Sequence, residues 1–163
     1  MRTVFYFTIT LIFLVSCANT KNEVESIDVL KSYSFEEVEK LMQKEPRQIA
    51  IFMHTHWCKY CKNMSQTTLK NKKVVDLLMN DYYFISFDGE QKESVVFNGN
   101  KFDYLPNGRN DGTHELATTL GTIDGHLAYP TFVFLNSKNE IIFHYASFLD
   151  SASLISILKE LSK

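Results

Sequence analysis

The feature that most restricts the fold of this chain is a pair of cysteines, Cys58 and Cys61, that closely follows a long apolar run. Residues 48–54 (QIAIFMH) are mostly apolar and contain no turn former, which is typical of a strand buried on both faces. Beyond residue 59, apolar side chains recur at helical spacing, at Leu69, Val74, Leu77 and Leu78. The cysteines are therefore predicted to lie on the first turn of a helix that begins where a central strand ends.

The remaining pattern predicts strands that alternate with helices and end in a hairpin. We expect strands at residues 27–33, 82–87, 131–135 and 141–145, the last two joined by the polar turn 136–139. A helix should begin after Ser34, with Glu37 completing a capping box. Further helices are expected at about 59–79, at 113–120 with Thr113 as the N-cap, and after Asp150 or Ser151. This order predicts an α/β fold, with a mixed central sheet covered by helices on both faces.

Length and charge limit the number of domains and the class of partner. The chain has 163 residues, of which 45% are hydrophobic, which suits one globular domain. Its formal net charge of −2 gives no basic footprint, so nucleic-acid binding is not expected.

The first residues differ from the rest of the chain. Arg2 is followed by an apolar run at 4–15 that is too short for a permanent membrane span and resembles the core of a secretory signal peptide. The run ends in Leu-Val-Ser-Cys17, which resembles the lipobox of bacterial lipoproteins. We therefore expect a lipoprotein signal peptide at 1–16, a lipidated Cys17, a flexible tether over 17–26 and a domain over 27–163. The alternative is an ordinary signal peptide with a chance cysteine.

If Cys17 carries lipid, Cys58 and Cys61 hold the remaining thiol chemistry. An exported compartment is usually oxidising, and a close pair there tends to cycle between disulfide and dithiol.

The segment from Trp57 to Lys62 (WCKYCK) after an apolar strand, together with Tyr129-Pro130-Thr131 before the closing hairpin, resembles the thioredoxin-fold thiol–disulfide oxidoreductases. The resemblance covers residues 27–163 and implies a thioredoxin-like fold with an insertion before a cis-proline loop. Within this frame Cys58, at a helix N-terminus, is the expected nucleophile, and Cys61 the resolving thiol. The residues expected to support the site and meet the substrate are Trp57, Lys59, Tyr60, Tyr129 and Pro130.

The resemblance also implies partners and a location. We expect a lipid-anchored protein in the bacterial cell envelope, facing the periplasm, that exchanges disulfides with envelope proteins and with an upstream thiol-redox partner, without a cofactor. Similarity to reducing domains of this family favours the reductase direction. One departure concerns Phe52, because cytosolic members carry a buried aspartate there that accepts a proton from the second thiol. His54 and His56 are candidates for that role because they are close in sequence, and Lys62 and Glu39 are further possibilities.

Residues 88–112 lengthen the connection before Tyr129 and contain several turn pairs. We expect an inserted loop or hairpin here, with strands flanking Asn98-Gly99-Asn100. It is either a lid that faces the substrate, with Phe102 and Tyr104 as contact residues, or a surface elaboration.

A different class of function remains open. His54, His56, Cys58 and Cys61 supply two imidazoles and two thiols, a set that suits zinc or copper. The alternative is therefore a thioredoxin-fold module that binds metal through these four side chains. Covalent haem attachment is excluded, because Lys62 stands where C-x-x-C-H requires histidine.

Overall fold

The computed structural model describes residues 29–108 and 111–163. The predicted signal peptide, the lipidation site at Cys17 and the tether lie outside these residues. The helices are α1 (Phe35–Met42), α2 (Lys59–Gln66), the 3₁₀ helix η1 (Thr68–Lys70), α3 (Lys72–Asp81), α4 (Glu115–Gly121) and α5 (Ser151–Leu161). None of the helices in the described part of the chain is long and apolar enough to cross a membrane.

The central sheet has four strands in the order β10-β9-β1-β2. Strand β1 (Gln48–His54) pairs in parallel with β2 (Tyr82–Asp88) and antiparallel with β9 (Thr131–Leu135), which in turn pairs with β10 (Ile141–Tyr145). The smaller two-stranded sheets are formed by β3 (Val95–Phe97) with β4 (Asn100–Phe102), β5 (Tyr104–Pro106) with β6 (Gly112–His114), and β7 (Thr122–Ile123) with β8 (His126–Leu127). The mixed α/β sheet predicted from the sequence is confirmed.

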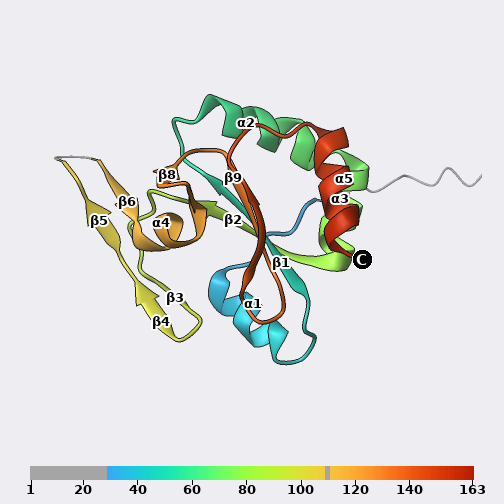
Figure 1. The fold of residues 1–163 in the computed structure, drawn as a ribbon, viewed down its shortest axis with the longest axis horizontal. Helices are drawn as coiled ribbons and strands as arrows, with labels where there is room; N and C mark the ends of the chain where they lie inside the picture. The colour runs from blue at the N-terminus through green and yellow to red at the C-terminus, as the bar shows by residue number, and fades with distance from the viewer. Residues whose placement is uncertain (1–28, 109–110) are drawn as a thin grey trace, which may run out of the picture.

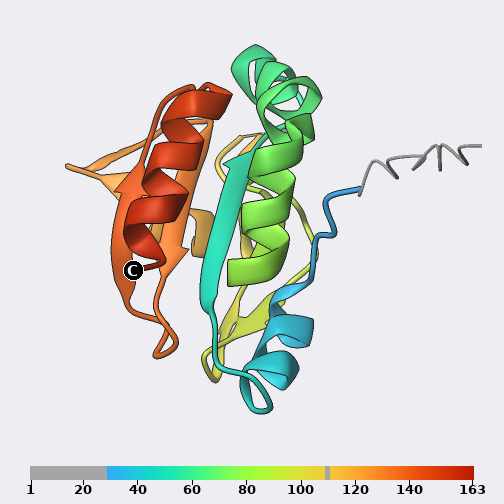
Figure 2. The same ribbon diagram turned by 90° about the vertical axis from the view of Figure 1, so that its right-hand side faces the viewer.

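Two apolar clusters cover the two faces of this sheet. Alternate side chains of β1 point to opposite faces, so Ile49, Ile51 and Met53 pack with α1, α4 and β3. Ala50 and Phe52 pack with α2, α3 and α5 on the other face. Figure 1 shows α1 and α4 on one side of the sheet and α2, α3 and α5 on the other, and Figure 2 shows α3 and α5 running side by side.

Local signals set several helix starts as predicted. Ser34 and Glu37 form both hydrogen bonds of the capping box on α1. Asp150 caps α5 by accepting from the Ser153 amide. The predicted hairpin around Asn98 and Gly99 is present as β3-β4 and, with β5-β6, extends from the main body (Figure 1).

Three expectations about local structure were wrong. The described part of 27–33 is not a strand: Tyr33 donates one backbone bond to Phe84, but the hydroxyl of Ser32 takes the Ser86 amide, so no ladder forms. The expected helix 59–79 is broken, because Thr68 donates to the Leu149 carbonyl and Asn71 starts a new helix.

The third correction concerns α4. Thr113 lies in β6, and the side chain of His114 caps the helix instead, its Nδ1 accepting from the Leu116 amide at 3.1 Å. Its Nε2 lies 3.2 Å from the Glu93 carbonyl. The fully buried imidazole therefore joins α4 to the loop that follows β2.

Candidate active site

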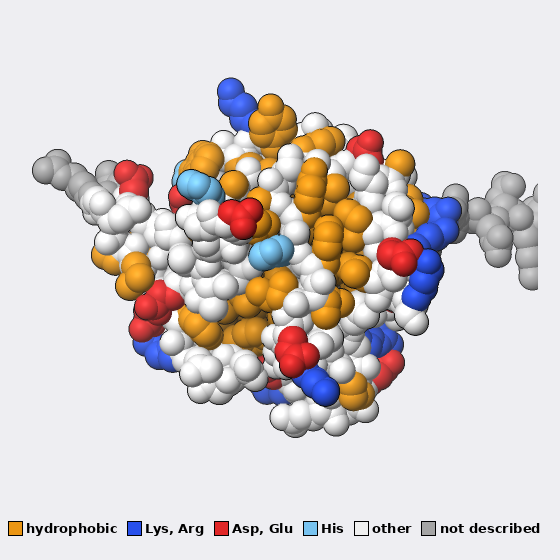
Figure 3. All heavy atoms as spheres, in the orientation of Figure 1, with side chains coloured by type: hydrophobic (Ala, Val, Ile, Leu, Met, Phe, Trp, Pro, Cys, Tyr) orange, Lys and Arg blue, Asp and Glu red, His pale blue; other side chains and the backbone are white. Residues whose placement is uncertain are grey.

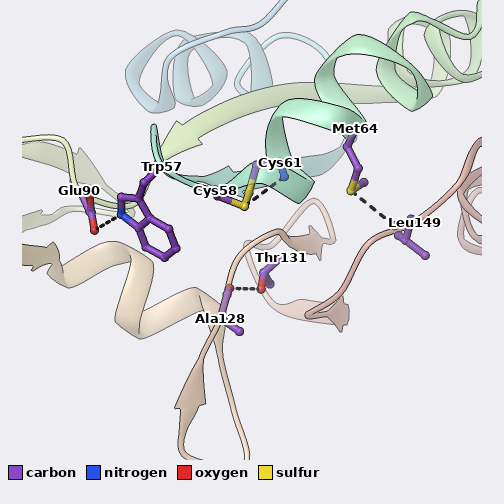
Figure 4. The surroundings of a disulfide bond; sticks show 8 residues. All are labelled: Trp57, Cys58, Cys61, Met64, Glu90, Ala128, Thr131 and Leu149. Atoms are coloured by element: carbon purple, nitrogen blue, oxygen red, sulfur yellow. Dashed lines mark hydrogen bonds between the residues drawn. A yellow bond between two sulfur atoms is a disulfide. The ribbon is translucent and has the colours of Figure 1, made fainter.

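Cys58 and Cys61 are joined by a disulfide bond at the start of α2 (Figure 4). Cys58 is the N-cap residue of this helix, and its sulfur accepts a hydrogen bond from the Cys61 amide at 3.1 Å. Both residues are buried, with Cys58 at 5% exposure and Cys61 at 2%. The sequence pattern thus predicted the position of the pair correctly, at the junction of strand and helix.

This position favours negative charge on the outer sulfur. The first amides of a helix lack backbone partners within it, and the helix dipole is positive at this end. The first turn of α2 has no acidic residue, and it carries Lys59 with Lys62 just beyond, both exposed. The Cys61 amide and the nearby lysines would stabilise a thiolate at Cys58 once the disulfide is reduced.

Trp57 lies at the surface beside the disulfide and is 58% exposed. Its indole Nε1 donates to Oε1 of Glu90 at 2.9 Å (Figure 4), and its ring meets that of Tyr129 edge-on at 6.2 Å. Glu90 belongs to the loop after β2, where its amide donates to Asp88, and its other carboxylate oxygen lies 3.6 Å from Nδ1 of His56. Sequence reasoning missed Glu90, and its only signal was a position just beyond the Asp88-Gly89 turn.

The loop before β9 lies next to both the disulfide and Trp57. The Tyr129–Pro130 peptide bond is cis, as the family resemblance implied. The Thr131 hydroxyl donates to the Ala128 carbonyl at 2.7 Å and closes the loop (Figure 4). The phenol of Tyr129 packs against Gly89, where a Cβ would overlap the ring. Burial raises the pKa of Tyr129 to about 12, and the carboxylates of Glu90 and Asp88 act in the same direction.

Tyr60, between the two cysteines, is 66% exposed, and its ring lies 6.5 Å from that of Phe148. Two exposed aromatic side chains, Trp57 and Tyr60, therefore flank the disulfide. In Figure 3 a basic and a hydrophobic side chain project next to each other over the α2 end of the molecule. We call this surface around the disulfide the rim. It can contact a polypeptide that presents both apolar and polar groups.

Phe52 packs in the same apolar cluster as both cysteines, so the position of the family's buried acid is apolar here. His54 follows on the same side of β1, with its ring 5.5 Å from that of Phe52 and its Nε2 3.0 Å from the Ser86 hydroxyl. Burial lowers the pKa of His54, and Asp88 opposes this shift. His56 is instead mostly exposed beside Glu90. The two histidines thus have separate surroundings.

The alternative metal site is not assembled. Across residues 29–108 and 111–163, no group of three or more His, Cys, Asp or Glu side chains is placed to hold a metal ion. His54 bonds Ser86 and His56 faces Glu90, while the two sulfurs are bonded to each other. With the disulfide formed, the alternative set of His54, His56, Cys58 and Cys61 is therefore not brought together around one point.

The fold and this site define a thioredoxin-fold thiol–disulfide oxidoreductase. A sequence profile described as "Thioredoxin-like domain" matches residues 35–162, so the chain belongs to the thioredoxin-like domain family.

Solved structures share this fold at low sequence identity. A thioredoxin from Thermus thermophilus has 22% identity and a TM-score of 0.58, over 82% of this chain and 87% of the other. The oxidoreductase DsbH has 16% identity and a TM-score of 0.55, over 80% and 83%. A disulphide isomerase from Xylella fastidiosa Temecula1 has 16% identity and a TM-score of 0.52, over 85% and 95%. No curated protein matches the sequence.

Proposed function

We propose that this protein is a lipid-anchored reductase of protein disulfides in the bacterial cell envelope. The observation that carries the redox part is the Cys58–Cys61 disulfide at the start of α2, next to the exposed Trp57 and the cis Pro130 loop. The anchor rests on the sequence of residues 1–16 and on Cys17, which resemble a lipoprotein signal and its lipidation site.

The reaction follows from the two sulfurs. In the dithiol form, the Cys58 thiolate attacks a substrate disulfide, forms a mixed disulfide and releases one substrate sulfur as a thiolate, which takes up a proton. Cys61 then gives up its proton and attacks the Cys58 sulfur, so that the enzyme disulfide forms and the second substrate sulfur leaves. The substrate gains two electrons and the enzyme loses two, and a thiol donor upstream must reduce the pair again.

The remaining rim residues have roles in binding. Trp57 and Tyr60 offer apolar contacts to the chain around the substrate disulfide. The backbone of Tyr129, next to the cis bond, can pair with an extended substrate segment. Lys59 adds positive charge beside the nucleophile.

The first experiment is a redox titration of the full-length protein in a nonionic detergent, in graded thiol–disulfide buffers. Trp57 is the only tryptophan in the sequence, so its fluorescence reports the state of the neighbouring pair. We expect one reversible two-electron transition near about −270 mV, the range of reducing thioredoxins. A midpoint near about −120 mV would reverse the proposed direction, and no reversible transition would overturn the redox function.

Two variants test the rest of the proposal. Cys61→Ser should accumulate mixed disulfides with envelope proteins, which Cys58→Ser should not, because only the former keeps the attacking sulfur and loses the resolving one. Cys17→Ala should leave the protein uncleaved and without acyl label in cells fed labelled fatty acid. Equal acyl labelling of this variant and the wild type would reject the anchor.

A further inference from the structure

Five lysines lie on the helical segment of the chain that begins at the disulfide. We call them the lysine ridge: Lys59, Lys62, Lys70, Lys72 and Lys73, on α2, η1 and the first turn of α3. All five are exposed. No aspartate or glutamate occurs anywhere between residues 46 and 75, so the sequence leaves this stretch without an acid of its own.

The ridge contrasts with the rest of the protein. The chain has 17 Lys and Arg and 19 Asp and Glu. Outside the ridge, 12 basic and 19 acidic residues remain, so the rest of the sequence has a formal net charge of −7. Within the described residues, Lys72 pairs with Asp76 at 3.6 Å, whereas Lys59, Lys62, Lys70 and Lys73 have no ion pair. The stretch from residue 46 to residue 75 is thus strongly positive in a protein with a small net charge.

The lysine ridge begins at the disulfide itself. Lys59 stands between the two cysteines and Lys62 follows Cys61 directly, while the 3₁₀ helix η1 packs on both α2 and α3 and carries the positive charge onward. Lys70 has a different environment from the lysines beside the cysteines. It lines a groove with Leu69 and Val75 near the start of the described chain. A bound polypeptide that reaches the disulfide along α2 therefore passes over positive charge.

We propose that the lysine ridge is a docking surface for acidic polypeptide segments, so that the preferred substrates carry several carboxylates close to the reacting cysteine. This inference rests on the proposed oxidoreductase function and names its substrate class. Like charges on neighbouring turns repel one another, and an acidic partner relieves that repulsion. Opposite charge also raises the rate of encounter, an effect that salt screens over about 10 Å at 0.1 M.

The test uses the full-length dithiol protein in a nonionic detergent and three peptides. Each peptide has one cysteine held as a mixed disulfide with 2-mercaptoethanol, flanked on both sides by Glu, by Gln or by Lys. One turnover oxidises Cys58 and Cys61 to the disulfide and releases the peptide thiol and 2-mercaptoethanol. The second-order rate constant is followed by Trp57 fluorescence at low and at high salt.

We expect the Glu peptide to react about tenfold faster than the Gln peptide at low salt, the Lys peptide to react more slowly than both, and salt to remove the differences. The variant K70E/K73E should lower the rate for the Glu peptide severalfold and leave the Gln peptide unchanged. The matched control K44E/K138E reverses the charge at two exposed lysines, one after the end of α1 and one in the β9–β10 turn. This variant should behave like the wild type.

The outcomes separate this inference from the proposed function. No reaction with any peptide overturns both. Equal rates for the Glu and Gln peptides, or an equal loss in the control variant, overturn the docking surface and leave the oxidoreductase function in place. Binding to vesicles of anionic lipid that K70E/K73E abolishes, without any preference among the peptides, assigns the ridge to the membrane and overturns this inference.

Discussion

Tyr82 and Tyr129 both have a buried hydroxyl, but only that of Tyr82 has a hydrogen-bond partner among the described residues. The Tyr82 hydroxyl donates to the Leu158 carbonyl at 2.7 Å, and burial raises its pKa to about 12. The Tyr129 hydroxyl is buried beside the active-site loop and has no partner among the described residues. A buried polar group without a hydrogen bond costs free energy, whereas a satisfied one contributes modestly. The two sites therefore form a matched pair.

We expect Tyr82→Phe to lower the free energy of unfolding by about 1 kcal/mol, and Tyr129→Phe to leave it unchanged or to raise it by up to about 1 kcal/mol. Urea unfolding of both variants measures the difference. An equal loss in the two would mean that the Tyr129 hydroxyl is satisfied in solution.

His54 gives the stability a dependence on pH. Its pKa is below the ordinary value of 6.5 in the folded protein, because burial disfavours the charged ring. Between the folded and unfolded values the unfolded chain binds more protons, so this group contributes stability that is present above pH 6.5 and is lost as the pH falls. We expect His54→Asn to lose less stability than the wild type between pH 7.5 and 5.5 in urea unfolding. Parallel curves for the two proteins would contradict this.

At the scale of elements, helix ends are held by both local and distant groups. Ser34 caps α1 and Asp150 caps α5 from within a few residues. The last turn of α3 has no basic residue of its own, and Arg47 supplies one from just before β1. Its Nη1 donates to the carbonyls of Met79 and Asn80 at 3.3 and 2.9 Å. A cation at the C-terminus of a helix is stabilising, so Arg47 ties α3 to the sheet.

We expect Arg47→Gln to lower the free energy of unfolding by about 1–2 kcal/mol, with Arg47→Lys in between, because lysine keeps the charge but not the planar set of donors. Thermal or urea unfolding measures both, and Lys44→Gln, at an exposed lysine nearby, is the matched control. Identical stability of Arg47→Gln and Lys44→Gln would show that these bonds contribute nothing.

At the scale of the whole molecule, the redox pair is part of a core. The disulfide packs in the apolar cluster formed by α2, α3, α5 and one face of the sheet. Oxidation and folding are therefore linked: the difference in stability between the two redox forms equals the difference in potential between the folded and unfolded pair, where about 30 mV corresponds to about 1.4 kcal/mol.

The proposed reductase direction requires a folded state that favours the disulfide, so on this proposal we expect the oxidised form to unfold at a higher urea concentration than the dithiol form. Paired unfolding curves with and without a reductant test this, and the double variant Cys58→Ser/Cys61→Ser should give the same curve in both. A more stable dithiol form would indicate an oxidant.

The sequence by itself determined the elements whose signals are local. The apolar run 48–54, the capping box of Ser34 and Glu37 and the hairpin 131–145 all depend on residues within a few positions of one another, and each forms as predicted. The position of Cys58 and Cys61 at the start of a helix belongs with these, because it needs only the strand before the pair and the helix after it.

Contacts between distant segments were decided only by the tertiary structure. The Thr68–Leu149 hydrogen bond spans 81 positions and helps to end one helix, and the Trp57–Glu90 bond joins the loops that follow β1 and β2. His54 and His56 meet different neighbours because the chain turns between them. Such contacts depend on the order and register of the strands, β1 beside β2 and β9, which bring together residues whose own sequence surroundings carry no signal for one another.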